Sequence, residues 1–406
     1  MQPLYLFAPE NDMALAFGGK YYTPAPVGRC IAHDLSLLPL WYAAGDNAAV
    51  WSEQQIPDEM REVLIALGIT SYATTQLPCH DMACRPWGWS AYIVERLARM
   101  GVARHLLPDD EAIDKIRTLS GRATSRHILQ ALQQSNIGYP LPLLPEVLHT
   151  ALDVEQYIAS QPASILKSPW SSSGRGVWNV EKGYDTSTAR YAESIIRKQG
   201  YIMGERLLDK VVDFAMEFYS DGTTVEFAGY SLFTTDERGA YQGNILASNS
   251  DIEHRLATYI EVEHLHATQS ALEEVLTTIV APHYKGYMGI DMILYRNEAN
   301  KILLHPCIEL NLRMSMGMVA RIIADRYLSP LSHGKYHVAY MPEGYRLQEL
   351  HATLAQEHPL RIDNHKIAGG YLALTPVTPD THYLAYIVVE VKNPNRNATF
   401  FGSIEK

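Results

Sequence analysis

Short apolar runs alternate with amphipathic segments over the first hundred residues. The runs 4–7 and 48–51 have the length and composition of buried strands. In the segment 58–68, apolar residues recur at helical spacing, acidic residues fill the first turn and a glycine ends the pattern. A second helix is expected over 90–100. Because strands that alternate with helices form a parallel sheet covered by helices, we predict an α/β domain over residues 1–109.

The pattern changes to antiparallel β-structure after a proline-rich connector at 140–145, which follows a helix expected over 120–136. Further strands are expected at 164–167, 177–180, 201–205, 211–219, 223–231, 287–295 and 302–312, with helices at 191–197, 268–282 and 315–327. Asp221-Gly222 favours a two-residue hairpin turn. We expect an α+β unit over 110–330, with a small subdomain at about 140–205, a large one at about 206–330, and a β-containing C-terminal extension over 331–406.

Composition and charge exclude several classes of protein. The 406 residues are 47% hydrophobic, which is enough to bury a core without disulfide or metal staples. The formal net charge of −11 argues against non-specific nucleic-acid binding, which requires clustered Lys and Arg. No apolar run approaches the ~20 residues that span a bilayer. The start of the chain lacks a signal-peptide pattern and the four cysteines are scattered, so we expect a cytoplasmic protein without membrane or nucleic-acid partners.

The segment 165–177 combines a lysine in an apolar strand with a loop of small residues. Lys167 ends the apolar run and is followed by Ser171, Ser172, Ser173, Gly174, Arg175 and Gly176. A lysine among apolar residues is costly unless an anion meets it, and a Ser/Gly loop leaves backbone N–H groups free to approach phosphate oxygens. The two features together suit a nucleoside triphosphate, although no Walker A Gly-Lys-Ser/Thr is present. The alternative is a surface hairpin whose lysine reaches solvent.

A second group of polar residues lies on two apolar strands near the end of the α+β unit. Asp291 stands among apolar neighbours, while Glu309 and Asn311 alternate with apolar residues and share one strand face. A polar turn at 296–300 folds the two strands together. This oxygen-only set fits Mg²⁺, with Mn²⁺ as an alternative, bound together with substrate phosphates. Arg313 continues the same face and offers a planar fork to a phosphate or carboxylate. The alternative is a polar strand that faces solvent.

The order of these features resembles the ATP-grasp superfamily, which includes D-alanine–D-alanine ligase, glutathione synthetase and biotin carboxylase. The resemblance covers about residues 110–330, and its specific part is the Glu-x-Asn-x-Arg motif from Glu309 to Arg313. It implies an ATP clamped between two α+β subdomains that contain antiparallel sheets. It also implies a preceding α/β domain, the pre-ATP-grasp domain, which agrees with the independent prediction for residues 1–109.

The resemblance also implies roles for individual residues. Lys167 matches the strand lysine that contacts the ATP phosphates, the segment 171–176 matches the loop that covers them, and Glu205 matches the hinge acid that holds adenosine. The remaining matches are Asp291, Glu309 and Asn311 as magnesium ligands and Arg313 as the arginine that faces the reacting phosphoryl group. An earlier basic residue contacts ATP in this family. Lys115, Arg122 and Arg126 are the candidates, of which Arg122 best suits the start of a helix.

The function implied by the resemblance is an ATP-dependent ligase that joins a carboxylate to an amine, or to a thiol, through an acyl phosphate. Such chemistry requires charge neutralisation, here by Mg²⁺, Lys167 and Arg313, rather than a protein nucleophile. Two alternatives stay open: a phosphotransferase with a small-molecule hydroxyl acceptor, and a non-catalytic nucleotide-binding protein. The sequence determines neither the two substrates nor the oligomeric state.

Two weaker signals concern contacts with the substrate. Glu10, Asn11 and Asp12 follow the first predicted strand, at the carboxyl end where α/β sheets bind ligands. The segment 241–244 is expected to lie in a long polar loop that orders over the substrate. Either segment is equally compatible with an ordinary surface loop.

Overall fold

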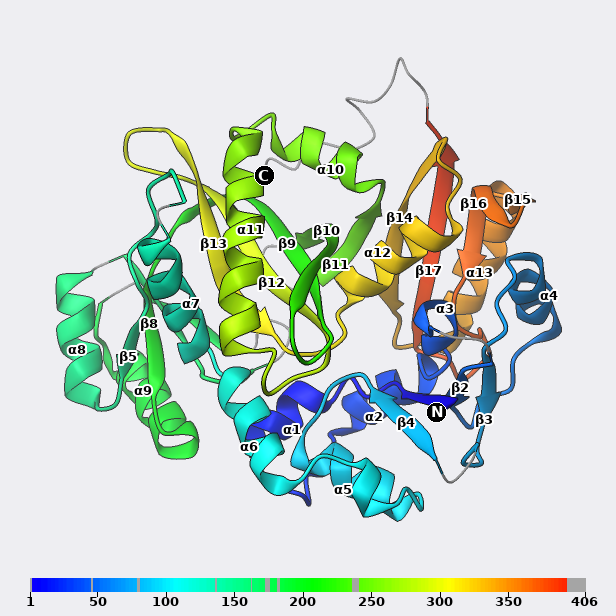
Figure 1. The fold of residues 1–406 in the computed structure, drawn as a ribbon, viewed down its shortest axis with the longest axis horizontal. Coiled ribbons are helices and arrows are strands. Elements are labelled where there is room, and N and C mark those ends of the chain that lie inside the picture. Colours follow the sequence, from blue (N-terminus) through cyan, green and yellow to red (C-terminus); the bar gives the residue numbers. More distant parts are fainter. Residues whose placement is uncertain are drawn as a thin grey trace.

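The computed structural model describes residues 2–44, 47–78, 81–135, 137–161, 163–171, 176–180, 183–235 and 241–392. These residues form three β-sheets, of four, four and nine strands. In Figure 1 the small sheet with helices α8 (Ala151–Ser160) and α9 (Thr186–Gln199) lies at one side of the molecule, and the N-terminal domain lies below. The strands from β14 (Ser332–Tyr340) to β17 (Tyr383–Val391) lie at the opposite side. No helix in the described ranges is both long and apolar enough to cross a membrane.

The N-terminal domain is a parallel four-stranded sheet in the order β3-β2-β1-β4, covered by helices, as the alternating pattern predicts. The predicted helix over 90–100 is confirmed, and the Ser90 hydroxyl caps it by accepting from the Ile93 N–H at 3.4 Å. Its elements are β1 (Gln2–Leu6), α1 (Asn11–Phe17), α2 (Pro26–Asp34), α3 (Pro39–Tyr42), β2 (Ala49–Trp51), α4 (Asp58–Ala66), β3 (Tyr72–Thr74), β4 (Met82–Pro86), α5 (Ala91–Arg99) and a 3₁₀ turn (Arg104–Leu106).

The second sheet is antiparallel, has the order β5-β8-β6-β7, and contains the lysine strand and its predicted partner. It has a hydrophobic cluster of its own, formed with helices α8 and α9 around Val154, Leu166 and Ile202. The elements of this region are α6 (Asp110–Leu119), α7 (Ala123–Gln134), β5 (Glu146–Leu148), α8 (Ala151–Ser160), β6 (Ser164–Lys167), β7 (Val177–Val180), α9 (Thr186–Gln199) and β8 (Ile202–Arg206).

The third sheet has nine antiparallel strands in the order β13-β12-β9-β10-β11-β14-β17-β16-β15. Strands from the C-terminal segment therefore extend the same sheet, joined to it by the pairing of β11 with β14. Its elements are β9 (Asp209–Ser220), β10 (Val225–Thr235), β11 (Tyr241–Leu246), α10 (Asn249–Leu256), α11 (Val262–Ile279), β12 (Gly286–Arg296), β13 (Ile302–Asn311), α12 (Met316–Tyr327), β14 (Ser332–Tyr340), α13 (Gly344–Glu357), β15 (Arg361–Asp363), β16 (Lys366–Ala373) and β17 (Tyr383–Val391).

Two local predictions for this sheet are wrong. The segment 241–244 is not in a loop, because it forms part of β11, where it pairs with β10 and β14. The hairpin between β9 and β10 does not turn at Asp221 and Gly222, because the ladder ends at Ser220 and Val225 and the Asp221 N–H donates to the Thr224 carbonyl at 3.1 Å, which leaves Gly222 and Thr223 at the tip. Gly222 nevertheless has the positive φ of 97° for which a glycine is favoured in this turn.

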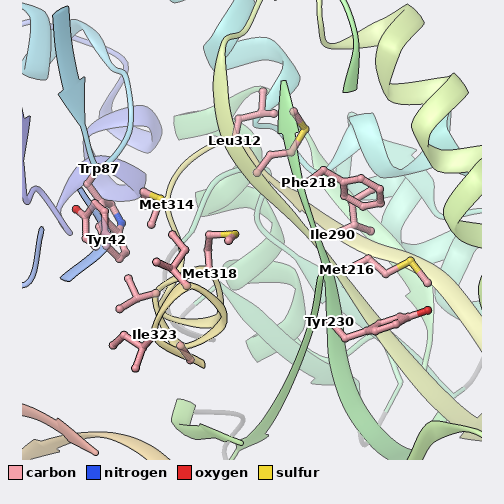
Figure 2. Close-up of a cluster of buried hydrophobic side chains, with 14 of the residues drawn as sticks. Tyr42, Trp87, Met216, Phe218, Tyr230, Ile290, Leu312, Met314, Met318 and Ile323 are labelled. Atoms are coloured by element: carbon pink, nitrogen blue, oxygen red, sulfur yellow. The ribbon is translucent and has the colours of Figure 1, made fainter. Parts of the chain in front are cut away.

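Strand β9 shows how the sheet separates a core face from a polar face. Val212, Phe214, Met216 and Phe218 alternate along it and are buried in the main hydrophobic cluster. Figure 2 shows Met318 and Ile323 of helix α12 between this sheet and the N-terminal residues Tyr42 and Trp87. The N-terminal domain and the large sheet share one hydrophobic cluster. In Figure 2 Met216, Phe218 and Tyr230 point away from α12, so the side chains that alternate with them on β9, such as Glu217, lie on the face that α12 covers in part.

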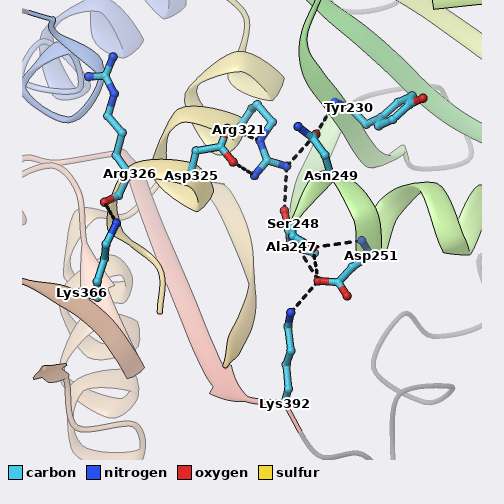
Figure 3. Close-up of polar contacts among 10 residues, drawn as sticks. All are labelled: Tyr230, Ala247, Ser248, Asn249, Asp251, Arg321, Asp325, Arg326, Lys366 and Lys392. Atoms are coloured by element: carbon cyan, nitrogen blue, oxygen red, sulfur yellow. Dashed lines mark hydrogen bonds and ion pairs between the residues drawn. The ribbon is translucent and has the colours of Figure 1, made fainter. Parts of the chain in front are cut away.

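Buried polar contacts fix helix α12 and its neighbours against the large sheet (Figure 3). Arg321 is almost fully buried, donates to the Ala247 carbonyl at 2.8 Å and forms an ion pair with Asp325. Lys392, after the last strand, pairs with Asp251 at the start of α10 at 2.7 Å. These contacts position α12, whose first residues border the cavity described below.

Candidate active site

A cavity of about 1710 Å³ lies against the polar face of the large sheet. Side chains from the N-terminal domain and from two of the sheets line it, including Asp12 from helix α1, Lys167 from the small sheet and Asp291 from the large one. Ligand pockets typically have about 300–1,000 Å³. The cavity therefore has room for more than one ligand.

Lys167 is buried at the end of β6, where it is 7% exposed. Its Nζ donates to Oε2 of Glu205 at 2.5 Å, and the two strands pair so that Ile165 lies opposite Glu205. The alternative of a solvent-facing lysine is thereby excluded. The Oε1 atom of Glu205 has no hydrogen-bond partner within the described structure. A buried ion pair with an unsatisfied oxygen, facing a cavity, is typical of a polar binding site.

His305 on β13 lines the same part of the cavity. Burial lowers the pKa of its imidazole to about 4, although the charge of Glu205 opposes this effect. The ring is therefore neutral at physiological pH, and its Nδ1 has no partner within the described residues. A neutral imidazole here offers one donor and one acceptor to a ligand.

The ends of the small-residue loop meet at the cavity. The Ser168 N–H donates to the Gly176 carbonyl at 2.7 Å, and Ser171 lines the cavity beside Lys167. A Cβ on residue 176 would lie 2.7 Å from the Ser171 hydroxyl oxygen, so the close approach favours glycine. Residues Ser172, Ser173, Gly174 and Arg175 lie outside the described residues. Their role as a phosphate-covering loop stays a prediction.

The predicted metal ligands come together as their alternation on the strands suggested. Asp291 on β12 lies directly opposite Glu309 on β13, and Asn311 lies opposite Gly289. Burial, followed by the charge of Glu309, raises the pKa of Asp291 to about 7. The described residues contain no cluster of three or more His, Cys, Asp and Glu side chains placed to hold a metal ion. Two carboxylates and one amide fit a Mg²⁺ that takes its other ligands from phosphates and water.

Arginines hold two of these three oxygen ligands. Arg122 pairs with Glu309 at 2.9 Å and donates to the Ser171 hydroxyl at 3.3 Å. Arg313 donates to Oδ1 of Asn311 at 3.0 Å and pairs with Asp12 at 2.6 Å. Burial lowers the pKa of Arg313, but the Asp12 carboxylate outweighs it, so the net pKa is raised and the guanidinium stays charged.

The other two candidates for the earlier basic residue lie elsewhere. Lys115 is exposed on α6, and Arg126 donates to the Pro145 carbonyl. Of the three, Arg122 alone lines the cavity.

The segment after β1, which includes the start of helix α1, reaches the cavity as its position predicts. Asp12 contacts Arg313, and Glu10 pairs with Arg96 at 3.0 Å. The side-chain amide of Asn11 is fully buried, and neither its nitrogen nor its oxygen has a hydrogen-bond partner among the described residues.

Glu217 is a cavity residue that the sequence analysis missed. It lies on β9 on the same face as Asp213 and Ala215, is 2% exposed, and accepts from the Ser315 hydroxyl at 2.9 Å. Burial raises its pKa to about 8. Its signal in the sequence is the one that identified Lys167, a charged residue inside an apolar strand.

No protein-family model and no curated protein matches the sequence. Among solved structures, the chain is similar to N5-carboxyaminoimidazole ribonucleotide synthetase from Thermus thermophilus, with a TM-score of 0.51 and 12% identity over 98% of this chain and 95% of that one. It is also similar to Rhizobium etli pyruvate carboxylase, with a TM-score of 0.51 and 13% identity over 99% of this chain and 37% of that one. These similarities confirm the predicted ATP-grasp fold.

Proposed function

We propose that this chain, which has the ATP-grasp fold, is an ATP-dependent ligase that joins a carboxylate to an amine through an acyl phosphate. The observation that carries the proposal is the convergence of Lys167, Arg122 and Arg313 on one cavity with the oxygen ligands Asp291 and Glu309. Cations and oxygen ligands in one cavity are the components that phosphoryl transfer requires, because it depends on positioning and charge neutralisation.

Nucleotide binding is assigned to the side of the cavity between the small and large sheets. Lys167 and Arg122 would contact phosphate oxygens there, close to Ser171. Glu205 and the neutral His305 would face the nucleoside, since each has a buried polar atom that lacks a partner within the described structure. Binding would satisfy these atoms, whose burial without hydrogen bonds is otherwise costly.

Asp291, Glu309 and Asn311 would hold Mg²⁺ together with the phosphates, and the bound ion would supply positive charge next to the transferred group. Arg122 and Arg313 already neutralise Glu309 and Asp12 in the protein alone. Arg313 remains charged at all physiological pH values and would face the transferring phosphoryl group. We assign it and Lys167 as the catalytic residues.

The proposed reaction has two steps. A carboxylate oxygen attacks the terminal phosphorus of ATP, and the bond from that phosphorus to the ADP oxygen breaks. The amine nitrogen then attacks the acyl carbon, the bond from that carbon to the phosphate oxygen breaks, and inorganic phosphate leaves while a proton passes to solvent. The partners would thus be small molecules.

The decisive experiment uses hydroxylamine as a general amine. The full-length protein is incubated with ATP, Mg²⁺ and a panel of carboxylic acids, and hydroxamate and phosphate are measured together. The proposal requires a hydroxamate that forms in a one-to-one ratio with phosphate for at least one acid. Formation of a stable phosphate ester on a hydroxyl compound would instead identify a phosphotransferase, and absence of ATP binding would refute both functions.

A further inference from the structure

Glu217 differs from the other buried acids of the described structure. Glu10 and Glu205 pair with Arg96 and Lys167, and Asp34 accepts from the backbone N–H groups of His382 and Tyr383. Among the described residues, Glu217 forms no ion pair. Its Oε1 accepts from one neutral hydroxyl, and its Oε2 has no hydrogen-bond partner.

The surroundings of Glu217 are arranged to make space for its carboxyl group. A Cβ on Gly289 would lie 2.6 Å from Oε2, and a Cβ on Gly317 would lie 2.5 Å from Oε1. The absence of a side chain at these two glycines therefore provides the space that the Glu217 carboxyl occupies at the cavity wall. An isolated buried carboxylate costs several kcal/mol, so a site that is shaped around one implies a cationic partner.

Neutral polar groups complete this end of the cavity. Asn244 donates its amide to the Ser231 hydroxyl at 2.7 Å, and the Tyr241 hydroxyl donates to the Asn244 oxygen. These three residues line the cavity with Glu217 and Ser315. Arg313 acts on Glu217 only through its more distant charge.

The C-terminal strands form the wall beyond this polar group. Val338 and Tyr340 on β14 and Tyr383 on β17 line the cavity, and the two tyrosine rings lie with centroids 4.7 Å apart. Because β14 pairs directly with β11, this wall continues the sheet past Tyr241. A ligand at Glu217 thus occupies a cavity whose lining includes these aromatic and aliphatic side chains.

We propose that Glu217, with Ser231, Tyr241, Asn244 and Ser315, forms the subsite that binds the ammonium group of the amine substrate. The inference rests on the proposed ligase function. An ammonium group supplies three hydrogen-bond donors, which match the carboxylate and hydroxyl oxygens of this subsite. It also provides a positive charge to pair with the Glu217 carboxylate. The C-terminal wall indicates a primary amine with an apolar or aromatic remainder.

The test measures binding of simple amines to the full-length protein saturated with ADP and Mg²⁺. The probes are butylamine, phenethylamine, phenylalanine amide and putrescine, each compared with its N-acetylated form, with binding followed by ligand-observed NMR. We expect at least one free amine to bind and its acetylated form to bind at least tenfold more weakly. Glu217→Gln should weaken amine binding at least tenfold while ADP affinity stays within twofold.

Two further variants make the result specific. Glu226→Gln removes a carboxylate from an exposed position of neighbouring β10 and should leave amine binding unchanged. Glu217→Asp keeps the charge but withdraws it by one methylene group, and should bind the amine more tightly than Glu217→Gln does. Retained ADP binding shows that each variant is folded.

The outcomes separate this inference from the function on which it rests. If ADP binds but no free amine does, or if Glu217→Gln binds the amine as tightly as the unmodified protein, the ammonium subsite is wrong and the nucleotide site stands. If ADP itself does not bind the unmodified protein, the ligase function is wrong, and the subsite falls with it.

Discussion

The buried carboxyl of Glu217 predicts a specific dependence of stability on pH. Burial raises its pKa from 4.5 to about 8, so the folded protein keeps a proton that the unfolded chain releases over this interval. A state that binds more protons loses stability as the pH rises. The free energy of unfolding should therefore fall between pH 4.5 and about 8, and the loss is complete above the folded pKa.

The size of the effect follows from the width of the interval. About 3.5 pH units at about 1.4 kcal/mol each give about 5 kcal/mol for full ionisation of Glu217 in the folded protein. Roughly 1.4 kcal/mol of this is already lost at pH 5.5, so about 3–4 kcal/mol remains to be lost between pH 5.5 and 9. Glu217→Gln replaces the carboxyl with an amide of nearly the same shape that does not ionise. The variant should therefore not show this decrease in the free energy of unfolding.

The assay is guanidinium unfolding followed by tryptophan fluorescence at pH 5.5, 7 and 9, without nucleotide and with EDTA. Relative to the unmodified protein, Glu217→Gln should gain about 3–4 kcal/mol between pH 5.5 and 9. Burial also raises the pKa of Asp291, to about 7, but that group titrates in both proteins and largely cancels in the difference. The exposed control Glu226→Gln should gain nothing. A gain below about 1 kcal/mol for Glu217→Gln would mean that the carboxyl is already ionised in the folded protein, and the reasoning from burial would fail.

Three other predictions test the rest of the cavity. Lys167→Ala should weaken ADP binding at least tenfold in calorimetry. It should also lower the free energy of unfolding by about 3–5 kcal/mol, because it leaves Glu205 buried without its cation. Adding Glu205→Gln should restore stability but not ADP affinity, and wild-type affinity in Lys167→Ala would disprove the phosphate contact. Glu309→Gln should fold normally but require more Mg²⁺ for ATP-dependent phosphate release, and an unchanged Mg²⁺ dependence would count against the metal assignment. Gly317→Ala should lower the midpoint of thermal unfolding, since the new methyl group overlaps the Glu217 carboxyl and such overpacking costs about 1–3 kcal/mol. An unchanged midpoint would show that the neighbouring side chains move to accommodate the methyl group.

Local patterns were sufficient to predict most elements and several of the charged residues that line the cavity. The lysine of β6 stood out because a charged residue in an apolar strand needs a partner, and Asp291, Glu309 and Asn311 stood out because strand side chains alternate with a period of two. The structure places Lys167 buried at the cavity and brings Asp291 opposite Glu309. Both inferences used only residues that are close together in the sequence. The contact between the strands of Asp291 and Glu309 followed from the predicted turn at 296–300, which joins them.

Tertiary structure alone decided how distant segments meet. Asp12 and Arg313 form an ion pair across 301 positions of the chain, and Arg122, the residue before α7, reaches Glu309 on β13. The C-terminal strands join the large sheet through β14, and the pattern of their own residues does not reveal this partner. Glu217 was overlooked because Asp213 also stands among apolar residues of this strand. Only the packed sheet shows that Glu217 is buried at the cavity and has no ion pair among the described residues. Alternation within a strand is set by backbone geometry and is readable locally, whereas the pairing of strands and charges across the chain depends on how all the apolar faces are buried together.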